Sequence, residues 1–193
     1  MKIVTVPNLN LREPSQPVSR PDRHLKRLLT DLQNTLMHSD IGVGLAAPQI
    51  DVHLRVFAVN LPKNANEKIP VYHYFINPSI TNHPQEKNFG ASPKDKAELE
   101  GCLSIPHIYA PVARWPWIDV TYQRLENGQL VTYHEHFTNF ASRVFQHEFD
   151  HLDGILFTDH ALSQGTQLYH EVADQDQLQK ITPQDLIDLY GEF

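Results

Sequence analysis

Cysteine is nearly absent from this sequence of 193 residues, in which Cys102 is the only one. A single thiol excludes an intrachain disulfide and points to a reducing compartment. A lone cysteine is most often a small buried hydrophobe, although it can also be a metal ligand or a nucleophile. The role of Cys102 therefore has to be inferred from the motifs in the rest of the sequence.

Long apolar runs and an excess of positive charge are also missing. No segment approaches the ~18 apolar residues that a membrane-spanning helix needs, and the N-terminal stretch lacks the continuous apolar region of a secretory signal. The formal net charge is −7, which disfavours binding of nucleic acid by the whole surface, though not by a local basic patch. We therefore expect a cytoplasmic protein with no membrane partner and no sequence-specific contacts to nucleic acid.

The overall composition is that of an ordinary globular protein. Hydrophobic residues make up 40% of the chain and charged residues 20%, and 193 residues favour one compact domain over two. Residues 11–22 are proline-rich and predict an extended surface segment. Residues 81–99 are polar and interrupted by proline, which predicts an exposed loop or insertion.

Leucine periodicity and capping residues predict a helix near each end. Leucines recur at i, i+3, i+4, i+7 and i+11 from Leu25, which predicts a core-packing helix over roughly residues 21–38 with Pro21 near its first turn. A short last helix is predicted over residues 184–190. Its predicted N-cap, N1 and N3 residues are Thr182, Pro183 and Asp185.

Strand patterns fill much of the remaining chain. Residues 41–50 contain too much glycine for a helix. The Asn127-Gly128 pair is typical of a β-hairpin turn, because both of its positions need a positive φ. Since strands and helices are interspersed without regular βαβ spacing, we predict an α+β fold. The predicted strands lie at about residues 54–60, 71–77, 117–123 and 129–137.

The most informative segment is FQHEFDHLDG, residues 145–154, which contains the HExxH pattern. On a helix, His147 and His151 lie one turn apart on one face, so both imidazoles can reach one ion at ~2.0–2.1 Å. Glu148 can then reach a metal-bound water without binding the metal. The pattern arises by chance in about 4% of chains of this size, so its context matters.

The context of this motif favours a helix and hence a real metal site. Thr138 is a suitable N-cap, Gly154 is a suitable C-terminal stop, and the helix is predicted to run to about Asp153. Two histidines do not complete a site, however. A third ligand has to come from elsewhere in the chain.

Three positions could supply the third ligand, and they indicate different proteins. A metzincin would need a histidine at Phe157, whose phenyl ring cannot bind an ion. Glu171, twenty residues after His151, would give a thermolysin-like endopeptidase, although surface glutamates are common. Cys102 would give a three-ligand site with one position open for water or substrate, in which the metal keeps the sulfur deprotonated. A metal-free or structural-zinc binding module is a further, non-enzymatic interpretation.

Three motifs together resemble those of the peptide deformylase family. They occur in the order of that family and span residues 42–151. The resemblance implies one catalytic domain over residues 1–193, an α+β fold in which antiparallel or mixed strands surround a central HExxH helix, with an N-terminal helix and a short C-terminal helix. The three motifs are GVGLAAPQ (42–49), EGCLS (100–104) and QHEFDH (146–151).

The resemblance also implies a reaction, the hydrolytic removal of the formyl group from the N-terminal formyl-methionine of newly made chains. Glu148 would be the general base and then the general acid, while Gln49 and the backbone N–H of Leu103 would hold the oxyanion. Iron(II) is the implied ion in the cell, and the same ligands accept zinc, nickel or cobalt. The implied ligands of this one divalent metal ion are Cys102, His147 and His151.

The same resemblance implies how a peptide binds. Backbone groups of Gly42, Val43 and Gly44 would pair with an extended peptide. Val144 would form a wall of the methionine pocket, and Tyr109 stands where some relatives carry an arginine that helps hold the peptide. The implied partners are formyl-methionyl peptides and nascent chains, with the ribosome near its exit tunnel as a further candidate.

Charged residues near the motifs could support the site. The family commonly has an arginine after the cysteine motif, so Arg114 is expected to pair with Glu100. Arg143 is expected to pair elsewhere on the helix.

Overall fold

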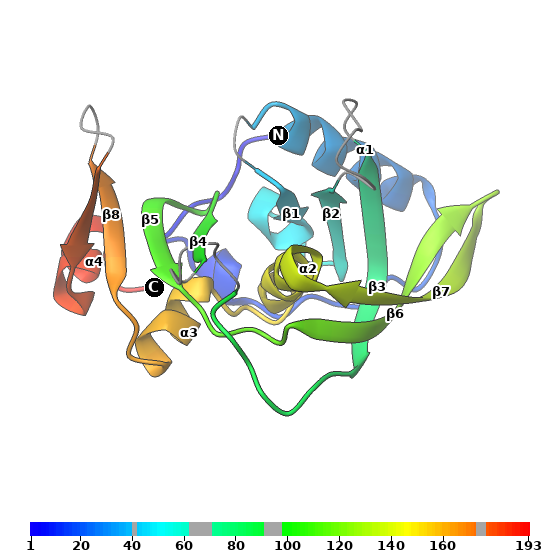
Figure 1. Ribbon diagram of the computed structural model, residues 1–193. Coiled ribbons are helices and arrows are strands. Elements are labelled where there is room, and N and C mark those ends of the chain that lie inside the picture. The colour runs from blue at the N-terminus through cyan, green and yellow to red at the C-terminus, as the bar shows by residue number, and fades with distance from the viewer. Residues whose placement is uncertain (40–41, 62–70, 91–97, 173–176) are drawn as a thin grey trace.

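The computed structural model describes residues 1–39, 42–61, 71–90, 98–172 and 177–193, and it confirms the α+β prediction (Figure 1). The α-helices are α1 (Arg23–Met37), α2 (Asn139–His151), α3 (Phe157–Ser163) and α4 (Pro183–Tyr190), and two 3-10 helices are η1 (Leu9–Arg12) and η2 (Ala47–Ile50). The strands are β1 (Gly44–Ala46), β2 (Val56–Asn60), β3 (Tyr72–Asn82), β4 (Leu99–Cys102), β5 (Ile105–Pro111), β6 (Trp117–Glu126), β7 (Gln129–Thr138), β8 (Leu168–Val172) and β9 (Gln177–Ile181). Within the described ranges, no helix combines the length and apolar character needed to cross a membrane.

Helix α1 begins at Arg23, two residues later than predicted. The Asp22 side chain caps it by accepting hydrogen bonds from the backbone N–H groups of His24 and Leu25 at 2.9 and 3.0 Å. Pro21 therefore directly precedes the N-cap and lies next to the first turn rather than inside it. An aspartate that satisfies two otherwise unpaired N–H groups fixes the start of the helix more strongly than the preceding proline.

Helix α2 carries the HExxH motif and ends two residues before its predicted end. It begins after Thr138, as predicted, although the Thr138 side chain makes no capping hydrogen bond. The helix stops at His151 because the chain then turns sharply through Gly154, whose φ is +71°. A Cβ at Gly154 would lie 2.3 Å from the carbonyl oxygen of Arg12, so only glycine fits this crossing.

The strands form two antiparallel sheets. One has the order β1-β2-β3-β6-β7 and the other the order β4-β5-β8-β9. The predicted hairpin joins β6 and β7, with φ values of +48° at Asn127 and +80° at Gly128. The predicted strand at 71–77 continues to Asn82, which overlaps the predicted loop at 81–99; residues 91–97 of that loop lie outside the described residues.

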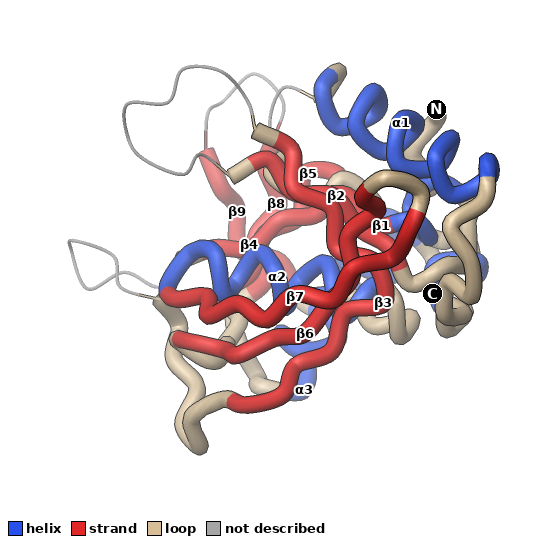
Figure 2. Tube along the Cα trace, turned by 90° about the vertical axis from the view of Figure 1, so that its right-hand side faces the viewer, coloured by secondary structure: helices blue, strands red, loops and turns tan. Residues whose placement is uncertain are grey.

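Alternation along β2 explains why helices cover both faces of the five-stranded sheet. Val56 and Ala58 pack with the buried leucines of α1, whereas Phe57 and Val59 pack with Val144 and Phe145 of α2. Successive side chains of a strand point to opposite faces, so α1 and α2 lie on opposite sides of this sheet (Figure 2). The predicted leucine stripe of α1 is therefore buried as expected.

The four-stranded sheet has its own core. Ile105 and Ile108 of β5 pack with Phe157 of α3 and Leu186 of α4. Cys102, at the end of β4, contacts the edge of this core. Because Cys102 at the end of β4 contacts His151 of α2, the cysteine motif of one sheet meets the helix that is packed on the other.

Candidate active site

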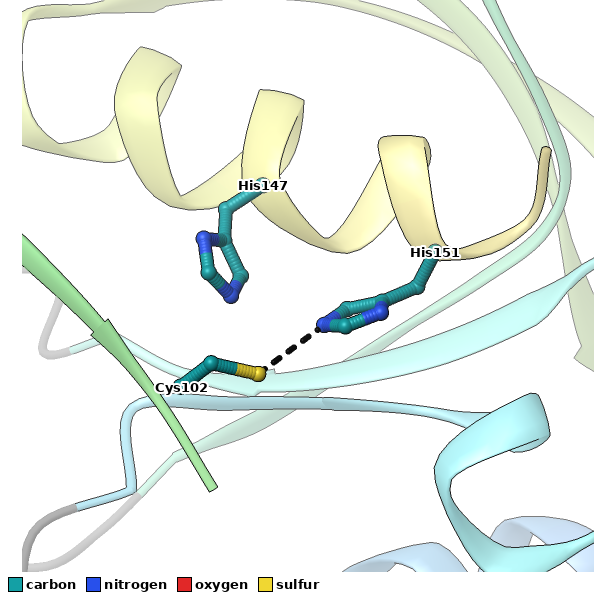
Figure 3. A group of neighbouring side chains, drawn as sticks. All are labelled: Cys102, His147 and His151. Carbon is teal, nitrogen blue, oxygen red and sulfur yellow. Dashed lines mark hydrogen bonds between the residues drawn. The ribbon is translucent and has the colours of Figure 1, made fainter. Parts of the chain in front are cut away.

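Cys102 and two histidines from a distant part of the chain meet at one point. Cys102 is the last residue of β4, and His147 and His151 lie one turn apart on α2 (Figure 3). Cys102 Sγ lies 3.2 Å from His151 Nε2, and the three potential ligand atoms all lie within 4.8 Å of one another. The sequence prediction that these three residues meet therefore agrees with the geometry, and one ion could bridge them.

The two alternative third ligands lie elsewhere. Glu171 is in β8 rather than on a helix, and its carboxylate contacts Tyr109 and His107. Phe157 packs its ring on that of His147, with 6.1 Å between the ring centroids. Among the described residues, neither belongs to the group of cysteine and histidines.

Glu100 orients the first histidine. Its Oε2 lies 3.2 Å from His147 Nδ1, which leaves Nε2 as the ring nitrogen available to the shared centre. Arg114 donates to both oxygens of Glu100 at 3.0 and 2.9 Å and also donates to Asp150 of α2. The expected pairing of Glu100 and Arg114 is present, and it ties β4 to the metal-motif helix. Burial alone would raise the pKa of Glu100, but Arg114 and His147 hold it far below its usual value.

Arg143 departs from its predicted role. The sequence predicts that it pairs elsewhere on the helix, yet its Nη2 lies 3.2 Å from Glu100 Oε1 and its Nε lies 3.3 Å from Glu98 Oε2. The reason is its spacing of four residues before His147, which places both side chains on one face of α2. Glu100 thus accepts from two arginines and one histidine.

The charges at the cysteine fit a cation site. Burial raises the pKa of the Cys102 thiol, but His151 and His147 outweigh it and hold that pKa well below its usual value. Burial lowers the pKa of His147, while its hydrogen bonds to Cys102 and Glu100 hold it well above its usual value. A thiolate and two oriented imidazoles form a sulfur and two-nitrogen donor set that suits zinc, iron(II), nickel or cobalt.

Glu148 is a buried carboxyl beside this group. It is 4% exposed, and its Oε2 has no hydrogen-bond partner among the described residues. Burial raises its pKa to about 7, against the opposing effect of the two histidines. A carboxyl with such a pKa can both accept and donate a proton near neutral pH. Gly44 makes room for it, because a Cβ there would lie 2.2 Å from Glu148 Oε1.

Gln49 presents its amide nitrogen to the cysteine. The residue is 1% exposed and lies in η2. Its Oε1 accepts from the backbone N–H of Ala46 at 2.8 Å, so the Nε2 group points the other way, 3.4 Å from Cys102 Sγ and 3.1 Å from Ser104 Oγ. Leu103 follows Cys102 in the turn between β4 and β5.

A cavity of about 820 Å³ opens onto this group from between the two sheets. His151 is 1% exposed and lies behind the lining. The predicted residues that line the cavity are Gly42, Val43, Gly44, Gln49, Cys102, Leu103, Tyr109, Val144, His147 and Glu148. Lining residues that the sequence analysis did not assign to the substrate site are Glu98, Leu99, Glu100, Gly101, Ile105, Pro106, His107, Ile108, Phe140, Arg143 and Glu171.

The unassigned lining residues lack a common motif. Four of them, residues 105–108, are consecutive along β5 and all line the cavity, so no alternation along this strand marked them in the sequence. Glu171 comes from β8, and only the pairing of β8 with β5 brings it to the cavity.

Comparisons with known proteins agree with this arrangement. The family model described as polypeptide deformylase matches residues 1–167. Peptide deformylase of Thermotoga neapolitana is 38% identical over 149 residues, which cover 77% of this chain and 79% of that protein, and the enzyme of Desulforudis audaxviator is 41% identical over 160 residues, covering 83% and 92%.

Solved structures give the same result for the fold. The crystal structure of a probable peptide deformylase from Synechococcus phage S-SSM7 has a TM-score of 0.70 and 34% identity, covering 83% of this chain and 99% of that one. Peptide deformylase of Thermotoga maritima has a TM-score of 0.67 and 36% identity, covering 82% and 95%. The chain therefore belongs to the polypeptide deformylase family, metalloenzymes that remove the formyl group from the N-terminus of nascent peptides.

Proposed function

We propose that this protein hydrolyses the formyl amide of N-formyl-methionyl peptides and nascent chains, using a divalent ion held by Cys102, His147 and His151. The observation that carries the proposal is the meeting of these three side chains beside the buried carboxyl of Glu148. Iron(II) is the proposed ion in the cell, and the cytoplasm is the proposed compartment. The bound ion would supply Lewis acidity and lower the pKa of a coordinated water.

Glu148 is the proposed proton-transfer group of the reaction. Its carboxylate accepts a proton from the attacking water, and the protonated form then donates that proton to the departing amine. A pKa raised to about 7 by burial suits both steps. Because Gly44 has no Cβ, the carboxylate can lie against the backbone that is proposed to hold the peptide.

Gln49 and Leu103 are proposed to stabilise the oxyanion that develops on the formyl oxygen. The hydrogen bond from Ala46 N–H fixes the Gln49 carbonyl, so its amide donors already point into the site. Donors that are held in place before the reaction cost no reorganisation in the transition state. The backbone N–H of Leu103 would be the second donor.

Peptide binding is proposed along the cavity. The backbone of residues 42–44 leads into β1 (Gly44–Ala46), the edge strand of the five-stranded sheet, and such an edge can pair with an extended chain of any sequence. Val144 is 9% exposed and lines the cavity one turn before Glu148, where it would contact the methionine side chain. Main-chain pairing suits an enzyme that processes many different nascent proteins.

A metal analysis combined with an assay of formyl-Met-Ala-Ser hydrolysis tests the proposal. Cys102→Ala should lose both metal and turnover, because the sulfur is one of only three proposed ligands. Glu148→Gln should keep the metal and lose 10²- to 10⁴-fold in kcat, the range that general acid–base groups supply. Gln49→Ala should lose about 10²- to 10³-fold, the typical cost of one oxyanion donor.

Glu135→Gln is the matched control. Glu135 is a partly exposed carboxylate on β7, outside the residues that line the cavity, so its removal should leave metal content and turnover unchanged. A folded Cys102→Ala protein with full metal content and an unchanged rate would reject the proposal. Absence of hydrolysis by every metal-loaded form would instead favour a structural metal module.

A further inference from the structure

The C-terminal hairpin adds a wall to the cavity that the family model does not include. The model matches residues 1–167, whereas β8 begins at Leu168 and β9 at Gln177. β8 extends the four-stranded sheet by pairing Ile108 with His170 and Tyr109 with Tyr169. This pairing brings the next residue of β8, Glu171, to the rim of the cavity.

Glu171 is positioned there by hydrogen bonds and yet remains available. Tyr109 donates its hydroxyl to Glu171 Oε2 at 3.2 Å, and His107 Nδ1 lies 3.4 Å from the same oxygen. The side chain is still 42% exposed. A carboxylate has about four acceptor positions, so these contacts orient Glu171 without exhausting its capacity to bind a cationic group.

Among the described residues, Glu171 forms an ion pair with His107 and with no lysine or arginine. The arginine that lines the cavity, Arg143, is 6% exposed and is paired with Glu98 and Glu100. Among the described lining residues, no lysine is present. The rim near β8 therefore favours a cation.

The position of Glu171 fits a peptide residue a short distance after the methionine. The Tyr109 ring packs over Gly101, where a Cβ would lie 2.7 Å from Tyr109 Cε1, and Gly101 directly precedes Cys102. The tyrosine hydroxyl then extends the path from the metal group to Glu171. An extended peptide advances about 3.3 Å per residue, so the second or third residue after methionine can reach this carboxylate.

We propose that Glu171 makes the enzyme select formyl-peptides that carry lysine or arginine two or three residues after the methionine. The inference rests on the proposed deformylase function. Glu171 acts by binding the side chain of the substrate, and it takes no part in the chemical step. The selection should therefore appear in KM rather than in kcat, because the contact is the same in the bound substrate and the transition state.

The test compares formyl-Met-Ala-Xaa-Ser and formyl-Met-Ala-Ser-Xaa peptides in which Xaa is lysine, glutamine or glutamate. The assays are run at low salt and at pH 8, where histidines are ordinarily neutral. At one of the two positions, kcat/KM for the lysine peptide should be about two- to fivefold higher than for the glutamine peptide, as expected for an exposed ion pair. Glu171→Gln should bring this ratio close to one, and Glu171→Lys should invert the preference toward glutamate. High salt should weaken the preference of the unaltered protein.

Glu135→Gln is again the matched control. Glu135 also accepts a hydrogen bond from a tyrosine, at 2.6 Å from Tyr122, and its side chain is 44% exposed, but it does not line the cavity. Glu135→Gln should leave the ratio of kcat/KM between the lysine and glutamine peptides unchanged. The affinity of the deformylated product Met-Ala-Lys-Ser, measured by calorimetry, should fall in Glu171→Gln by the same factor as the kinetic ratio.

The outcomes separate the two proposals. If the unaltered protein and both Glu171 variants hydrolyse all peptides with the same ratios of kcat/KM, the role of Glu171 is overturned. The proposed deformylase function would still stand. Hydrolysis of none of the formyl-peptides by the metal-loaded protein would overturn the deformylase function and, with it, the role of Glu171. A change in the ratio in Glu135→Gln as large as that in Glu171→Gln would also overturn the local role, because it would show an effect of net charge alone.

Discussion

Single residues create the space in which the proposed chemistry takes place. Gly44 and Glu148 come from different elements, β1 and α2, and approach so closely that any side chain at position 44 would occupy the place of the carboxylate. The glycine is needed here for close approach rather than for a left-handed backbone. The proton-transferring group and the peptide-binding edge thus share one small volume.

Gly44→Ala should lower kcat by on the order of 10²-fold, because the new Cβ would lie 2.2 Å from Glu148 Oε1 and displace the carboxylate, and misplacement by about 1 Å can have this effect. Steady-state kinetics measures it. In the Glu148→Gln background the same glycine substitution should cost little more, since coupled residues are not additive. A fully active Gly44→Ala enzyme would show that the carboxylate does not need this position.

Some residues of the candidate site could be predicted from the sequence, and others could not. The one-turn spacing of His147 and His151 follows from helix geometry, so their shared face was predictable from the motif alone. Cys102 lies on a strand of another sheet, and its approach was inferred from a family resemblance rather than from spacing. The position of Glu171 at the cavity depends on strand pairing, which no local pattern reports.

At the scale of elements, α4 completes the core of the four-stranded sheet with a single buried side chain. Leu186 is 3% exposed, whereas Leu189, on the same helix, is 50% exposed. Leu186→Ala should lower the free energy of unfolding by about 2–5 kcal/mol through lost burial and a cavity. Leu189→Ala should change it by less than about 0.5 kcal/mol. Urea denaturation of both variants measures the difference, and equal losses would mean that α4 is not anchored by Leu186.

The N-cap of α1 gives a pH-dependent prediction. The hydrogen bond from Leu25 N–H, with that from His24, holds the pKa of Asp22 below its usual value of 3.8 and outweighs the opposing effect of desolvation. A lowered carboxyl pKa in the folded state means that the stabilisation is present above pH 3.8 and is lost as the pH falls through the folded-state pKa. Asp22→Ala should therefore lower Tm at pH 7, and its deficit should narrow as the pH falls below 3.8.

Asp22→Asn is the control for this cap, because its amide oxygen can accept the same hydrogen bonds without titrating. The difference in Tm between Asp22→Asn and Asp22→Ala should remain across the same pH range. A deficit of Asp22→Ala that stays constant in acid would indicate that the charge of Asp22 contributes nothing to the cap.

Element boundaries were harder to predict than element types. The leucine stripe of α1 and the Asn-Gly hairpin are local patterns, and both are present in the structure. The exact end of α2 depends on the close passage of Gly154 beside Arg12, a contact across 142 positions of sequence. Such tertiary contacts determine where a helix ends, even where the local sequence favours another residue.

At the scale of the whole molecule, the proposed metal site joins two layers. Its sulfur comes from a strand of the four-stranded sheet and its imidazoles from the helix packed on the five-stranded sheet. An ion bound only by the folded chain stabilises it by RT ln(1 + [L]/Kd), or about 2.7 kcal/mol at a hundredfold excess over Kd. Removal of the ion should therefore weaken the contact between the layers.

Calorimetry with and without a chelator tests this coupling. Chelation should lower Tm, and added zinc should restore it. Cys102→Ala should be insensitive to the chelator, because it retains little metal. An unchanged Tm after complete removal of the metal, verified by atomic absorption, would contradict the proposed link between the layers.

The cavity draws its walls from residues 42 to 171, which is most of the chain. A copy still attached to the ribosome cannot assemble this cavity until residue 171 has been made, because the histidine helix and the β8 wall follow the other lining segments in the chain. Until then a growing copy has no cavity in which to bind a peptide.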